Sequence, residues 1–294
     1  PSAKRERILT AANGEVEHGQ IFVTPAPDPT FSPNDLDAVL AGVEDADEAV
    51  ADRSTSLQSA VAGLSGTNAA WAVLLAELSS RPGRALVDLS ETLAANLPVE
   101  AGLLADEVVY LPREIKGLER HTILIHGLND LYMRALDLST DAGKGSIPRF
   151  EARRLFDEMR VALSRSTNRL VLVEPADSPV LQALALDAID GASTLGWTDL
   201  ILAMQTEEMS EIEAIEGYLS EVEDLVELDK WQQAAARNRR AARLAHRIGD
   251  GALQREADEQ QIRIYLQQAD RLLQREAWQD AFADRDQFSL RPPR

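Results

Sequence analysis

The sequence predicts a mainly α-helical protein: a helical bundle with a short N-terminal β-hairpin arm and a C-terminal hairpin of long helices. Three observations lead to this expectation. Hydrophobic residues make up 45% of the chain and aromatic residues only 5%, so the core must be built from Ala, Leu, Val and Ile, which suit closely packed helices. Apolar residues recur at helical spacing along most of the chain. Glycine and proline interrupt these runs, as they do where helices end.

Three regions are expected from this pattern. Residues 1–30 form a β arm followed by a Pro-rich linker, residues 31–175 a helical bundle domain, and residues 176–294 a C-terminal helical region. With 294 residues, the chain is long enough for one large or two ordinary domains.

The arm is predicted from a turn signal and a run of prolines. Asn13-Gly14 is the dipeptide that best fits a tight hairpin turn, and apolar segments flank it on both sides. Three prolines between residues 25 and 29 then impose an extended linker. We expect the apolar side chains of the arm to contact another subunit, the candidates being Ile8, Val16, Ile21 and Phe22.

A long helix is expected after the linker. Ser32 can cap its start and Pro33 fits the first helical position. Apolar residues then recur every seven positions, which describes a helix of about 30 residues. Two interpretations stay open: a helix inside an intramolecular bundle, or a coiled-coil contact between subunits made by Leu36, Val43, Val50, Leu57 and Leu64.

The middle of the chain shows several apolar runs at spacings of three and four. Helices are predicted through Trp71 to Leu78, Leu86 to Leu97 and Leu118 to Leu136, and another is expected to begin at Pro148. Arg169 to Pro175 is the best internal strand candidate, because it is apolar, β-branched and closed by a proline.

Charge is segregated in the C-terminal region. Residues 207–229 carry ten acidic and no basic side chains, whereas residues 230–247 carry six basic and no acidic ones. This favours ion-paired packing, within the chain or between subunits. A protein partner and a nucleic acid backbone are the alternatives for the basic face, which is formed by Arg237, Arg240, Arg243 and Arg247.

One segment resembles a helix pair of the tetratricopeptide class. The similar elements are Trp231-x-x-Ala234, Ile248-Gly-Asp250, Tyr265 and Trp278-x-x-Ala281. The two Trp-x-x-Ala elements lie 47 residues apart, compared with a usual repeat of about 34. The resemblance implies a scaffold that binds a peptide of a partner protein.

No catalytic residue, metal ligand or cofactor site is predicted. His126-Gly127 is similar to the oxyanion loop of α/β-hydrolases, but the Gly-x-Ser-x-Gly element of those enzymes does not occur. Asp141 to Ser146 lacks the spacing of a phosphate-binding loop. The four histidines form no His-Glu-x-x-His pair, and there is no cysteine.

Composition narrows the expected partners. The net charge of −19 disfavours binding to nucleic acid, and no apolar run has the roughly 18 residues that a membrane span needs. The N-terminus lacks the apolar segment of a secretory signal. We therefore expect the protein to be cytoplasmic, or part of a particle assembled in the cytoplasm.

These observations predict a non-enzymatic structural or adaptor component of a multi-subunit assembly, such as a virion or another large particle. Its partners would be protein subunits, in a homo-oligomer or a larger assembly. Two alternatives are kept: a tetratricopeptide-like regulatory or scaffolding module, and an enzyme whose site is not visible as a motif.

Overall fold

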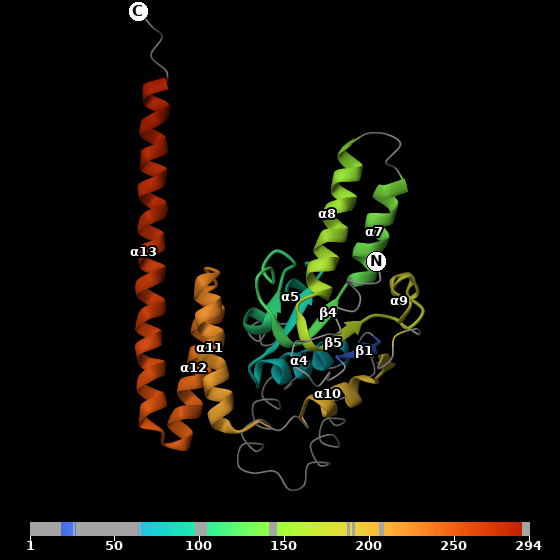
Figure 1. Ribbon diagram of the computed structural model, residues 1–294, viewed down its shortest axis with the longest axis horizontal. Helices are drawn as coiled ribbons and strands as arrows, with labels where there is room; N and C mark the ends of the chain where they lie inside the picture. The colour runs from blue at the N-terminus through green and yellow to red at the C-terminus, as the bar shows by residue number, and fades with distance from the viewer. Residues whose placement is uncertain are drawn as a thin grey trace, which may run out of the picture. The chain divides into compact units, whose positions relative to one another are not determined.

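A computed structural model describes residues 19–25, 27, 64, 66–97, 105–140, 146–186, 189, 192–205 and 209–289. The chain divides into two compact units, Pro1–Glu208 and Met209–Arg294. The first unit contains a β-sheet with helices, and the described part of the second is helical (Figure 1).

The sheet of the first unit has six strands in the order β3-β2-β4-β5-β1-β6, and every neighbouring pair is parallel. In the register, Ile123 of β4 and Ile21 of β1 flank Leu170 of β5. The strands are β1 Gln20–Thr24, β2 Arg84–Asp88, β3 Val109–Tyr110, β4 Arg120–His126, β5 Ser166–Val173 and β6 Ala192–Thr194.

Helices cover both faces of this sheet. The main ones are α4 Gly66–Ser79, α7 Leu128–Thr140, α8 Ser146–Leu163 and α10 Trp197–Gln205, with the short helices α5 Leu93–Asn96 and α9 Pro179–Leu184. In Figure 1, α4 and α10 lie on one side of the sheet, and α7 and α8 rise from the other. Leu124 and Val171 of the strands share a buried core with Trp71 of α4 and Leu200 of α10.

The predicted fold class is therefore wrong, because the first unit is an α/β structure and not a helical bundle. Two runs that were expected to be helices, Leu86 to Leu97 and Leu118 to Leu136, contain strands β2 and β4. Strands of a parallel sheet are buried on both faces and read as continuous apolar runs. Such runs also place apolar residues three and four positions apart, so their spacing resembles that of a helix.

The predicted hairpin arm is corrected as well. Gln20–Thr24 is the internal strand β1, which pairs in parallel with β5 on one side and β6 on the other. Its pairing partners are about 150 residues away along the chain, which no local turn signal could indicate. The proposed turn at Asn13-Gly14 lies outside the described residues.

Other predictions of single elements are confirmed. Arg169 to Val173 belongs to β5, which pairs with β4 and β1. Helix α4 contains the predicted run from Trp71 to Leu78. Pro179 opens α9, and the helix expected at Pro148 is α8, although its Phe150 is 71% exposed and does not face the core.

The second unit consists of α11 Glu211–Glu227, α12 Trp231–Ile248 and α13 Gly251–Ser289. Helix α11 begins after a cap at Ser210. The hydroxyl of this serine accepts a hydrogen bond from the backbone of Glu213, whose carboxylate accepts the Ser210 backbone N–H at 2.8 Å. These bonds, which form a capping box, lower the pKa of Glu213.

Ion pairs join α11 to α12, as the charge segregation predicted. The guanidinium of Arg237 lies 3.1 Å from the Glu221 carboxylate, and both side chains are buried. The same guanidinium lies over the ring of Tyr218 at 5.5 Å. At the exposed end, Arg247 pairs with Glu211. The acidic and basic stretches therefore pair with each other within one chain at these two places.

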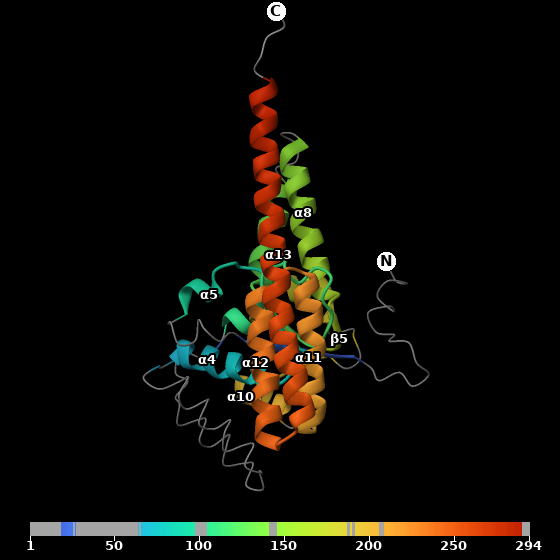
Figure 2. The same cartoon turned by 90° about the vertical axis from the view of Figure 1, so that its left-hand side faces the viewer.

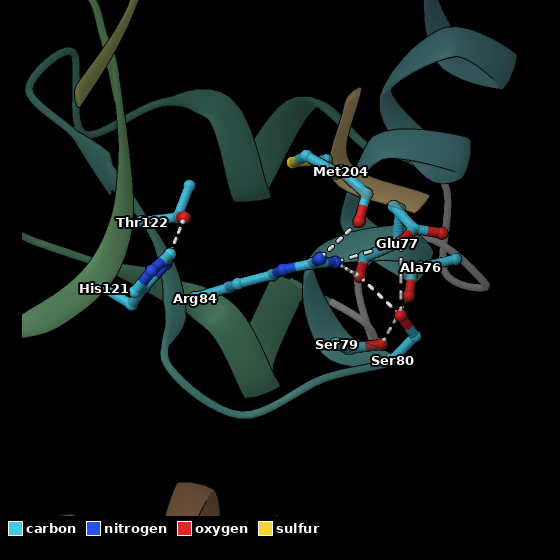
Figure 3. A network of polar contacts seen from close by, with 8 residues as sticks. All are labelled: Ala76, Glu77, Ser79, Ser80, Arg84, His121, Thr122 and Met204. Carbon is cyan, nitrogen blue, oxygen red and sulfur yellow. Dashed lines mark hydrogen bonds and ion pairs between the residues drawn. The ribbon is translucent and has the colours of Figure 1, made fainter. Parts of the chain in front are cut away.

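A buried arginine ties two helices to the sheet in the first unit. Arg84, the first residue of β2, is 1% exposed. Its guanidinium donates to the Glu77 carboxylate of α4 at 2.9 Å and to the backbone carbonyl of Met204 in α10 (Figure 3). Because a buried charge is costly without a partner, this network fixes the ends of α4 and α10 against the start of β2.

Replacing the buried arginine should destabilise the first unit strongly. Arg84→Met leaves the Glu77 carboxylate buried without its cation, which costs about 3–5 kcal/mol. Unfolding in urea, followed by the fluorescence of the core residues Trp71 and Trp197, measures the loss. The double variant Arg84→Met/Glu77→Leu removes both charges and should recover most of the stability. If the double variant were as unstable as the single one, the ion pair would not be the cause.

Candidate functional site

The carboxyl edge of the sheet is the first candidate for a ligand-binding site. In open parallel sheets, ligands bind where neighbouring strands send their connections in opposite directions. Here β3 lies on one side of β2, and β5 lies on the far side of β4, so this point falls between β2 and β4. Asp88 and His126 are the last residues of these two strands and face each other in register.

The two carboxylate oxygens of Asp88 hold the loop after β2 and the start of α5. Oδ1 accepts hydrogen bonds from the backbone N–H of Ser90 at 3.1 Å and from its hydroxyl at 2.6 Å. Oδ2 accepts the backbone N–H of Leu93, the first residue of α5, at 2.8 Å. The side chain is buried, so its charge is stabilised by these donors and holds the loop after β2 in place.

Glu174 has a similar role after β5. Its carboxylate accepts the backbone N–H of Asn129 at 3.1 Å, in the first turn of α7. The amide oxygen of Asn129 in turn accepts the backbone N–H of Val180 in α9 at 3.3 Å. Burial raises the pKa of Glu174, although the hydrogen bonds from the α7 amides oppose this rise. Glu174 therefore links the start of α7 to the end of β5.

His126 ends β4, beside Asp88 of β2 and Val173 of β5 in the register of the sheet. Its ring meets that of Trp71 edge to face, with the centroids 5.1 Å apart. Burial lowers the pKa of His126, while the nearby charges of Asp88 and Asp130 raise it. The imidazole is thus neutral at pH 7, and its Nδ1 has no hydrogen-bond partner among the residues that the structure describes.

The turn after His126 requires a glycine. Gly127 has a φ of +77°, and a Cβ at this position would lie 2.8 Å from the backbone nitrogen of Ser90. The loops after β2 and β4 can approach this closely only without a side chain at residue 127.

The polar groups at the carboxyl edge therefore serve mainly to hold helices. Asp88 caps α5, and Glu174 with Asn129 connects α7 and α9 to the sheet. Across the described ranges, no group of three or more His, Asp or Glu side chains could hold a metal ion. Sequence analysis did not identify Asp88 or Glu174. The available signal was that each of them ends or follows an apolar strand.

Glu174 gives this edge a testable pH dependence. Since its pKa is raised in the folded protein, the unfolded chain gives up this proton at lower pH, and the folded state loses stability as pH rises through the raised pKa. Glu174→Gln does not titrate, so the variant should gain stability relative to the wild type between pH 4 and pH 7. Thermal unfolding of both proteins across this range measures the difference. A difference that does not change with pH would contradict the assignment.

The second candidate is a surface of α13. One face of this helix packs in the second unit, where Leu253, Ala257 and Ile264 meet the core between the helices. The opposite face carries large apolar side chains that are more than half exposed: Ile262 60%, Tyr265 58%, Leu266 66%, Leu272 53% and Leu273 63%. We call these five residues, with the exposed Ala269 between them, the α13 stripe.

The length of α13 sets it apart from its neighbours. It has 39 residues, whereas α11 has 17 and α12 has 18. Figure 2 shows the three helices side by side, with α13 continuing past the ends of the other two. Part of α13 therefore has no helix of its own unit beside it.

The interface residues predicted from sequence lie in several places. Ile21 and Phe22 are in the internal strand β1, and Leu64 packs against the core of the first unit. Arg237 is buried on Glu221, Arg247 pairs with Glu211, and the exposed Arg243 donates to the carbonyl of Arg239. Arg240 is half-buried on α12. The remaining candidates, Ile8, Val16, Leu36, Val43, Val50 and Leu57, fall outside the described residues.

A groove runs between α11 and α13 of the second unit. Its volume is about 280 Å³. Val222, Val226 and Ile264 give it an apolar floor, and charged and amide side chains form its rim, namely Glu223, Glu227, Gln260, Arg263 and Gln267.

Searches of protein-family models, curated proteins and solved structures found no match to this chain. Within the described part of the chain, no helix is both long enough and apolar enough to cross a membrane, in line with the sequence prediction.

Proposed function

We propose that this protein is a structural or adaptor component of a multi-subunit assembly and that it associates through the α13 stripe. The observation that carries the proposal is the second apolar face of α13, on the side away from its own unit. Large apolar side chains grouped on one surface mark sites of protein contact more often than isolated ones do.

The geometry of the stripe fits a helix–helix contact. Ile262, Leu266, Ala269 and Leu273 follow one another at spacings of four, three and four residues, which is the spacing of a coiled-coil seam. A surface helix that packs on one side needs one such face. The second face of α13 is therefore available to another helix.

Charge favours association at this helix. The protein as a whole carries −19, which opposes close approach of two acidic chains. Residues 251–275 are neutral, because four arginines (255, 263, 271 and 275) balance four acidic residues (256, 258, 259 and 270). The segment that carries the stripe therefore adds no net repulsion of its own when two chains meet there.

A peptide-binding role is the second candidate, and the groove between α11 and α13 favours it. Its apolar floor and charged rim suit an amphipathic segment of a partner protein. The groove and the stripe lie on different faces of α13, so single variants separate them. Gln267→Lys changes the groove and leaves the stripe intact, and it should weaken association only if the groove is the contact.

Association through the stripe can be measured by light scattering. The full chain should show a mass above its 32.2 kDa that rises with concentration. Leu266→Gln/Leu273→Gln should weaken association by at least about 100-fold, because burying each leucine contributes at least about 1.5 kcal/mol. Both side chains are exposed, so circular dichroism and the unfolding midpoint should stay unchanged.

The matched control is Ile147→Gln/Phe150→Gln on α8. These side chains are 72% and 71% exposed, so the control removes a similar exposed apolar area from the first unit. It should leave the mass unchanged. The proposal fails if the wild type is monomeric at every concentration, or if the control abolishes association and the stripe variant does not.

A further inference from the structure

The α13 stripe also indicates which helix would lie on it. Resting on the proposed function, we infer that α13 pairs antiparallel with α13 of a second copy of this chain, around a two-fold axis between Gln267 and Gln268. Such a contact is isologous, since the same surface of each copy meets itself.

The order of residues along the stripe is symmetric about this point. In an antiparallel pair centred between residues 267 and 268, Ile262 of one copy lies across from Leu273 of the other. Leu266 likewise lies across from Ala269. All four side chains are exposed, and each pair occurs twice because of the two-fold axis. The small Ala269 leaves room for Leu266 at the centre, where the two helices come closest.

Charge complementarity supports the antiparallel direction. Arg263 and Asp270 are seven residues apart and therefore lie along the same flank of the stripe. Residues of one flank meet the same flank of the partner in an antiparallel pair. Arg263 of each copy would then lie beside Asp270 of the other, which gives two ion pairs of opposite charge.

Neither Arg263 nor Asp270 makes a buried interaction that would prevent this contact. Arg263 lies 3.9 Å from Glu223, but the two side chains are 60% and 67% exposed, so this pair contributes little. Asp270 accepts a hydrogen bond from the exposed Gln274 one turn away. Both groups can exchange these local contacts for the partner without loss of a buried interaction.

Disulfide trapping can test the direction, because the natural chain has no cysteine. Ile262→Cys and Leu273→Cys chains, carrying tags of different size, are mixed and oxidised gently. In the antiparallel pair these positions lie across from each other, and the mixed disulfide dimer should form. Each variant alone should give no disulfide dimer, since its two cysteines would be about 16 Å apart along the axis, beyond the roughly 7 Å that a disulfide spans.

Three other outcomes of these experiments would each lead to a different conclusion. Disulfide dimers from each variant alone would show a parallel pair and overturn the inference. Light scattering that shows stripe-dependent association, with no disulfide in the mixture, would also overturn it while the proposed function stands. A monomer at all concentrations would refute both. As a control, Gln267→Cys lies on the face toward the groove and should not cross-link.

Discussion

The pairing of β5 with β4 on one side and β1 on the other is the interaction on which the first unit depends. Parallel neighbours cannot be joined by a tight turn, so each connection must cross a face of the sheet. This requirement places α4, which connects β1 to β2, on one face and α7 and α8, which connect β4 to β5, on the other (Figure 1). It also brings the ends of β2 and β4 together, where Asp88 and His126 meet in register. The helices that begin nearby need acceptors for their free amides, and Asp88 and Glu174 supply them.

The sequence predicted helices better than it predicted the sheet, for a physical reason. Arg169 to Val173 was identified as a strand because a proline follows it and its apolar run is short. Thr122 to Ile125 is an equally good strand, yet it is flanked by Leu118 and Leu128 at helical spacing. In a strand that is buried on both sides, apolar and polar residues no longer alternate. The sequence then lacks the period of two that distinguishes a strand from a helix. Pairing of β1 with β5 depends on contacts between distant segments, which no local pattern contains.

For the candidate surfaces too, the sequence indicates some features, whereas others depend on how distant segments pack. The ion pairs between α11 and α12 were predictable, because an acidic segment followed directly by a basic one favours opposite-charge contacts when the two segments pack. Of the arginines expected to form an interface, Arg237 is buried on Glu221 inside the unit, and Arg247 pairs with Glu211. The spacing of Ile262, Leu266 and Leu273 is visible in the sequence. Which face of α13 is left exposed became clear only from the packing of α11 and α12.

The two faces of α13 differ in the kind of side chain that they use. Toward its own unit, α13 presents Ala257 and Gln260, and the Gln260 amide donates to the Leu219 carbonyl of α11 at 3.0 Å. On α12, the Asn238 amide donates to the carbonyl of Ala257 at 2.8 Å. These hydrogen bonds supplement the apolar core of the unit, to which α11 contributes Ile215, Tyr218 and Leu219. Among the described side chains of α13, Ile262, Leu266 and Leu273 lie on the other face. Since burying such side chains is the main source of association free energy, that face is the one suited to a partner.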